Sequence, residues 1–81
     1  MAPVIAACQR LREARESEAA ALAEKDQALV EWWEHSGLPK ARAGEAVQAA
    51  LAEAGWSLED IARVGVGSAN VRITLERARR I

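Results

Sequence analysis

From Val4 to Ser36 the chain contains neither glycine nor proline. This segment is rich in Ala, Glu, Arg, Gln and Leu, which all favour the helix. The pattern predicts one helix that ends near residue 36 and is about 50 Å long at 1.5 Å per residue. Residues 37–81 are too few to cover a helix of that length, so we expect part of its surface to meet a partner.

Small and apolar residues on this predicted helix indicate a seam between two helices. Alanines recur every seven residues along one face, and the larger apolar residues recur with a period close to eleven residues. We expect homodimerisation through this helix in an antiparallel arrangement, or a fold back as a hairpin if the helix breaks near residues 16–18. The expected interface residues are Ala7, Leu11, Ala14, Ala21, Leu22, Ala28, Leu29 and Trp33.

Gly37 and Pro39 end the long helix, because glycine stops a helix and proline cannot continue one. Three further helices are predicted over 40–54, 57–64 and 68–80. The expected fold is therefore all-α, with an oligomerisation helix at 1–36 and a compact three-helix domain at 37–81.

Large core side chains are scarce in this chain of 81 residues. Half of the residues are apolar, but alanine is by far the commonest of these, and the chain has no Phe or Tyr and three Trp. The tryptophans must carry much of the packing, and burial against a partner is expected. Trp32 and Trp33 point about 100° apart on a helix, which predicts different contacts for the two rings.

The strongest functional signal lies between Ser57 and Arg80. Ser57 and Asp60 form a capping pair at a helix start, and Gly65 provides the backbone freedom that ends the helix. The second helix of this stretch directs Val71, Leu75 and Ala78 inward and its arginines outward.

This stretch resembles the helix-turn-helix superfamily and is similar to sigma-factor C-terminal and transposase-type modules. The likeness is carried by Leu-Glu-Asp-Ile-Ala-Arg, a Gly-Val turn and a helix with Val71 and Leu75 at the family's spacing. The resemblance implies a recognition helix at 68–80 that enters the DNA major groove. Two residues separate Ala62 from Gly65 where the family usually has three, and this shortening favours a protein partner instead.

The resemblance places Ser68, Ala69, Arg72 and Ile73 at groove-facing positions. Arg72 could pair with guanine and Ile73 could contact a thymine methyl group. An equally weighted alternative is that Ile73 packs against the long helix or a second subunit. Asn70 is interpreted as a capping or phosphate-directed residue.

Charge is distributed unevenly along the chain, although its net charge is −1. Residues 1–36 carry four basic and seven acidic residues, whereas residues 61–81 carry five arginines and one acid. This asymmetry favours phosphate contacts by Arg77, Arg79 and Arg80. The alternative is a solvated helix end, because cations also stabilise a helix C-terminus.

No feature of the sequence favours an enzyme, a cofactor or a metal site. His35 has no ligand partners at metal-binding spacing, and Cys8 has no histidine to activate it. One cysteine forms no internal disulfide, and no stretch reaches the roughly 20 apolar residues of a membrane-spanning helix. We expect a soluble, cytoplasmic protein without a membrane partner.

The leading hypothesis is a small dimeric protein that binds double-stranded DNA as a transcriptional regulator or architectural factor. The alternative is an all-helical protein–protein adaptor, such as an antitoxin, a phage accessory factor or a polymerase-binding regulator, that does not contact DNA. A third option is a structural coiled-coil assembly unit.

Overall fold

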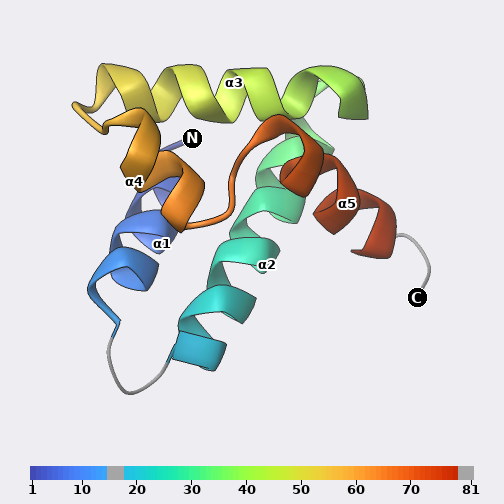
Figure 1. Cartoon of the computed structure of the whole chain (residues 1–81). Coiled ribbons are helices and arrows are strands. Elements are labelled where there is room, and N and C mark those ends of the chain that lie inside the picture. Colours follow the sequence, from blue (N-terminus) through green and yellow to red (C-terminus); the bar gives the residue numbers. More distant parts are fainter. Residues whose placement is uncertain (15–17, 79–81) are drawn as a thin grey trace.

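The computed structural model of the chain describes residues 1–14 and 18–78, and these residues form five helices and no strand. The helices are α1 (Ala2–Glu13), α2 (Glu18–Ser36), α3 (Lys40–Glu53), α4 (Leu58–Arg63) and α5 (Ser68–Ala78). Helices α1 and α2 pack side by side in opposite directions, and α3 runs across them (Figure 1). The all-α fold class is confirmed.

The prediction of one helix over residues 1–36 is wrong. Helix α1 ends at Glu13 because Ala14 adopts an extended backbone, with φ −67° and ψ 132°. The chain then reverses, and α2 packs along α1, which is the hairpin alternative. The hairpin is favoured because it buries Val4, Cys8 and Leu29 in a core shared with the later helices, where a straight helix would leave much of this surface exposed.

One hydrophobic cluster joins the two halves of the described chain. Val4, Cys8 and Leu29 lie in the same cluster as residues from α3, from α4 and the turn after it, and from α5, which are Ala43, Val47, Leu51, Ile61, Val64, Val66, Val71 and Leu75. The cluster thus crosses the boundary expected near residue 36. Trp32, Trp33 and Trp56 pack against it while partly exposed, which supplies the bulk that alanine lacks.

A polar contact also ties α1 to the second half of the chain. The Arg12 guanidinium lies over the Trp56 ring, 4.2 Å from its centre, and its Nη1 is 3.8 Å from Asp60 Oδ2. Cation–π and ion-pair contacts at partly exposed sites each contribute on the order of 1 kcal/mol or less. Arg12 therefore helps to position the hairpin beside the junction of α3 and α4.

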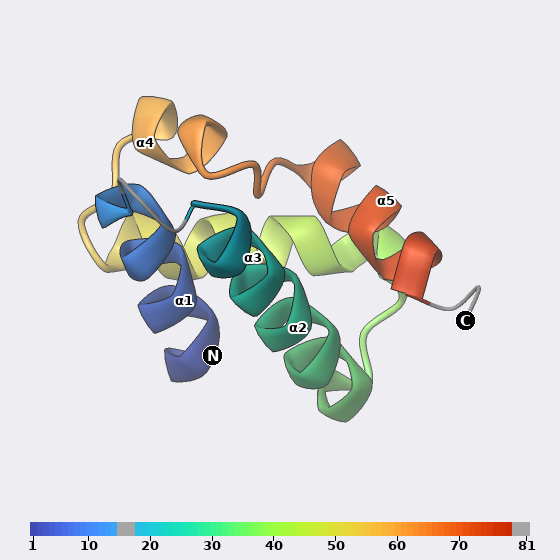
Figure 2. The same cartoon turned by 90° about the horizontal axis from the view of Figure 1, so that it is seen from below.

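Helices α4 and α5 lie toward opposite ends of α3 (Figure 2). Helix α5 packs against the N-terminal half of α3 and against α2, whereas α4 rests chiefly on α3. The support for α5 therefore comes mainly from α2 and α3, and its connection to α4 is the four-residue stretch from Val64 to Gly67.

Candidate nucleic-acid interface

Helix α4 begins at a side-chain cap, and the turn between α4 and α5 is held by a glycine and two buried valines. Ser57 Oγ accepts a hydrogen bond from the Asp60 N–H at 3.1 Å, which confirms the predicted start of α4. Gly65 ends it with φ +70°, a backbone conformation that strains any residue with a Cβ. Val64 and Val66 are buried on either side of Gly65, so the path of the chain into α5 is held by core packing.

A buried lysine secures the same turn from the neighbouring helix. Lys25 on α2 is 3% exposed, and its Nζ donates a hydrogen bond to the Val64 carbonyl at 3.1 Å. It also lies 3.3 Å from Asp26 Oδ1. A buried ammonium needs such partners, because removing its charge from water is costly. Lys25 and Val64 are 39 positions apart, so no local pattern in the sequence indicates this contact.

Helix α5 has a buried face and an exposed face. Val71 and Leu75 are buried against the core, four positions apart, as the helical pattern predicts. The opposite face carries five of the expected nucleic-acid contacts, all exposed: Ala69, Asn70, Arg72, Ile73 and Arg77. Ser68 is the first residue of α5, and its side chain lies outside the described residues, as do Arg79 and Arg80 in full.

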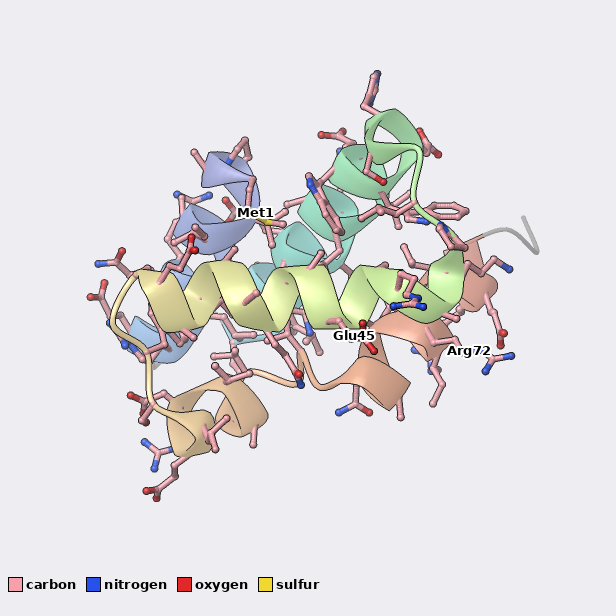
Figure 3. The ribbon with its side chains drawn as sticks, turned by 90° about the horizontal axis from the view of Figure 1, so that it is seen from above. Met1, Glu45 and Arg72 are labelled. Carbon is pink, nitrogen blue, oxygen red and sulfur yellow. The ribbon has the colours of Figure 1, made fainter. Side chains whose placement is uncertain are left out.

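Ile73 is half exposed. Its side chain is 50% exposed and lies outside the hydrophobic core cluster, and its packing against the long helix or a second subunit stays a prediction. Arg72 is also exposed, and its Nε lies 3.2 Å from Glu76 Oε1 one turn further along α5. Figure 3 shows Arg72 on α5 and Glu45 on the neighbouring helix α3. Exposed pairs of this kind are worth about 0.2–1 kcal/mol, so Arg72 can exchange Glu76 for another anion.

The flank of α5 that faces α2 is a groove of about 430 Å³. Its described lining is acidic on the α2 side, and Thr74 and Arg77 line it from α5. The α2 residues are Asp26, Gln27, Val30, Glu31 and Glu34. Asp26, Val30 and Glu34 follow a four-residue spacing that places them on one helix face, but nothing in the sequence shows that this face meets α5. A polyanion would be repelled on this side of α5.

The expected oligomer interface lies largely within the chain itself. Ala7, Ala21 and Leu29 are buried in the described structure, and Leu11, Ala14, Ala28 and Trp33 are partly buried. The Trp33 Nε1 donates a hydrogen bond to the Leu38 carbonyl at 2.8 Å. Leu22, which is 44% exposed, is the member of this set that remains accessible. In the described chain, α1, α2 and the core cover most of these residues, and a dimer through them stays a prediction.

The cysteine and histidine occupy structural positions. Cys8 is buried, and burial raises the pKa of its thiol above the ordinary value, while the Lys25 ammonium partly opposes this effect. His35 Nδ1 lies 2.8 Å from the Glu31 carbonyl oxygen, one turn earlier in α2. Among the described residues no three His, Cys, Asp or Glu side chains are grouped so that they could hold a metal ion.

No family model matches this chain, and comparisons with curated proteins and with solved structures give no match. None of the helices within the described ranges is long and apolar enough to span a membrane. The described residues thus form an all-helical fold in which α5 has an exposed face.

Proposed function

We propose that the protein binds double-stranded DNA through the exposed face of α5 and acts in the cytoplasm as a transcriptional regulator or architectural factor. The observation that supports this function is the division of α5 into two faces. Val71 and Leu75 hold the helix on the core, and Ala69, Asn70, Arg72, Ile73 and Arg77 remain available to a ligand.

The dimensions of α5 suit a major groove. Its 11 residues give a length of about 16 Å, and the groove is about 12 Å wide and admits a helix. Arg72 would read guanine through two hydrogen bonds, Ile73 would contact a thymine methyl group, and Arg77 would meet phosphate. Arg77 also lines the acidic groove beside α2, where the carboxylates of α2 would oppose phosphate.

Two-part recognition would require a second copy. Most residues of the expected seam are buried or partly buried in one chain, so a dimer through this seam would have to use the exposed Leu22 near the N-terminal end of α2. Such a dimer would present two α5 helices to a two-part site.

The test is fluorescence anisotropy with labelled duplex DNA at several salt concentrations, after a preferred sequence has been selected from a random pool. Phosphate contacts predict a linear loss of affinity on a log–log salt plot. Arg72→Ala should weaken binding to the selected sequence by about 1–3 kcal/mol and have less effect on random DNA, and Arg77→Ala should weaken both equally.

Arg63→Ala is the matched control for Arg72→Ala. Arg63 on α4 is similarly exposed, and its Nη2 lies 3.5 Å from Glu59 Oε1 in the same four-residue spacing. Its change should leave binding near the wild-type value, because α4 lies away from α5. Equal losses for Arg63→Ala and Arg72→Ala, or no binding at low salt, would contradict the proposal.

A protein–protein adaptor is the second candidate, and specific side chains favour it. Ile73 and Leu58, which is 82% exposed, are large apolar residues that one chain leaves uncovered. Isolated exposed apolar residues are common, but an isoleucine beside an arginine on a solvent-facing helix also suits a protein interface. Absence of DNA binding would make this candidate the leading one.

A further inference from the structure

The groove between α2 and α5 has an apolar floor and a charged rim. Val30 is partly buried and packs against the core cluster, and it lies in the described lining together with Asp26, Glu31, Glu34 and Arg77. Three of these residues are carboxylates and one is a cation, so the described lining has a net negative charge. This charge is opposite to that expected of the DNA-facing side of α5.

Two of the carboxylates in the lining, Glu31 and Glu34, are exposed. Asp26 Oδ1 is buried and lies 3.3 Å from Lys25 Nζ, which is its partner. Glu31 accepts a hydrogen bond from Gln27 Nε2 at 3.2 Å, which leaves its second oxygen available for a donor. Carboxylates next to an apolar floor fit a cationic group attached to an aliphatic segment.

We propose that this groove is a docking site for a basic amphipathic helix of a partner protein. A leucine-type side chain of the partner would pack on Val30, and flanking lysines or arginines would pair with Glu31 and Glu34. The groove volume of about 430 Å³ accommodates two or three side chains of such a helix. The site shares Arg77 with the proposed DNA-binding face, but its carboxylates lie on α2.

The test uses a fluorescein-labelled helical peptide with leucines at helical spacing and lysines and arginines between them. A matched peptide carries glutamate at every cationic position. The basic peptide should bind, and the acidic peptide should not. Glu31→Gln/Glu34→Gln should weaken binding of the basic peptide about three- to thirtyfold, as expected for two exposed charge pairs.

Glu13→Gln/Glu53→Gln is the control for total charge. Both residues are exposed, lie near the ends of α1 and α3, and do not line the groove. This variant removes the same two charges and should bind the basic peptide as the wild type does. Equal losses in the two double variants would show non-specific attraction and would overturn the proposal, as would failure of the wild type to bind the basic peptide.

Two further variants test the apolar contact and the relation between peptide binding and DNA binding. Val30→Ala should weaken peptide binding about three- to tenfold if the apolar floor is used, and an unchanged affinity would overturn that geometry. Arg77→Ala should strengthen peptide binding and weaken DNA binding. Both measurements are made on variants whose circular dichroism and thermal unfolding match those of the wild type.

The remaining outcome concerns a second copy of the chain. Sedimentation of the wild type and of Glu31→Gln/Glu34→Gln shows whether the groove holds another copy. A wild-type dimer that the double variant abolishes would identify self-association as the use of this groove, and would overturn the proposal of a basic partner.

Discussion

The α1–α2 hairpin and helix α5 differ in how far their apolar residues are buried. In the hairpin, Ala7, Ala21 and Leu29 are covered by the same chain, although their spacing suggests a seam with another molecule. In α5, Val71 and Leu75 are covered, but Ile73 remains exposed between arginine-bearing positions. The difference teaches that residues spaced for a helix–helix contact can be covered when the chain folds back, whereas the same chain leaves half of Ile73 exposed.

The largest expected effect tests whether the hairpin residues belong to the monomer core. Leu29→Ala should lower the free energy of unfolding by about 2–5 kcal/mol, because Leu29 is fully buried and its truncation leaves a cavity. Leu22→Ala should cost within about 0.5 kcal/mol, since Leu22 is partly exposed. Urea unfolding at two protein concentrations gives both values. A urea midpoint that depends on protein concentration, together with equal losses of stability in the two variants, would support dimerisation through these residues.

The next prediction concerns the hydrogen bond between α2 of the hairpin and the turn before α5. Lys25→Met should destabilise the protein by about 1–3 kcal/mol, because it leaves the Val64 carbonyl and Asp26 without their buried partner. Lys40→Met serves as the control, since Lys40 is partly exposed at the start of α3 and should change stability little. Thermal unfolding measures both. A neutral Lys25→Met would show that the lysine does not hold the turn before α5.

A smaller effect concerns the pH dependence of the hairpin. The folded pKa of the Cys8 thiol is raised by burial above the ordinary value of 9.0. The unfolded thiol therefore ionises first as the pH rises, so the stability contributed by the neutral thiol is complete below about pH 9 and is lost above it. The difference in unfolding free energy between wild type and Cys8→Ala should fall from pH 8 to pH 10. A constant difference would contradict the raised pKa.

The smallest expected effect lies on α5. Ile73→Ser should change the free energy of unfolding by no more than about 0.5 kcal/mol, because the side chain is half exposed. Val71→Ala in the same helix should cost more, since Val71 is fully buried. A large loss of stability in Ile73→Ser, measured in dilute protein, would mean that the rest of the chain covers Ile73. The difference in burial between α5 and the hairpin would then be contradicted.

Local signals predicted most of the helices correctly. The cap at Ser57, the stop at Gly65 and the spacing of Val71 and Leu75 all depend on residues within a few positions of one another. The helix over 40–54 was predicted to within one residue of α3 for the same reason. These features depend on local backbone geometry and on the spacing of apolar side chains along a helix, and both are determined by neighbouring residues.

The end of α1 was not predictable in the same way. The residues around Ala14 favour a helix, and the chain leaves the helix there because folding back buries more apolar surface than a straight helix would. Tertiary packing thus overrides a local preference that is worth only tenths of a kcal/mol per residue. The acidic groove was missed for a related reason, since its α2 and α5 residues are at least 40 positions apart.

The sequence by itself determined the helical class, the turn at Gly65 and which face of α5 is apolar, because each depends on short-range spacing. Only the tertiary structure decided that α1 folds back on α2, that Lys25 holds the Val64 carbonyl, and that carboxylates line one flank of α5. These contacts join residues far apart in the chain, and their energies come from burial and charge pairing that exist only once the helices have packed.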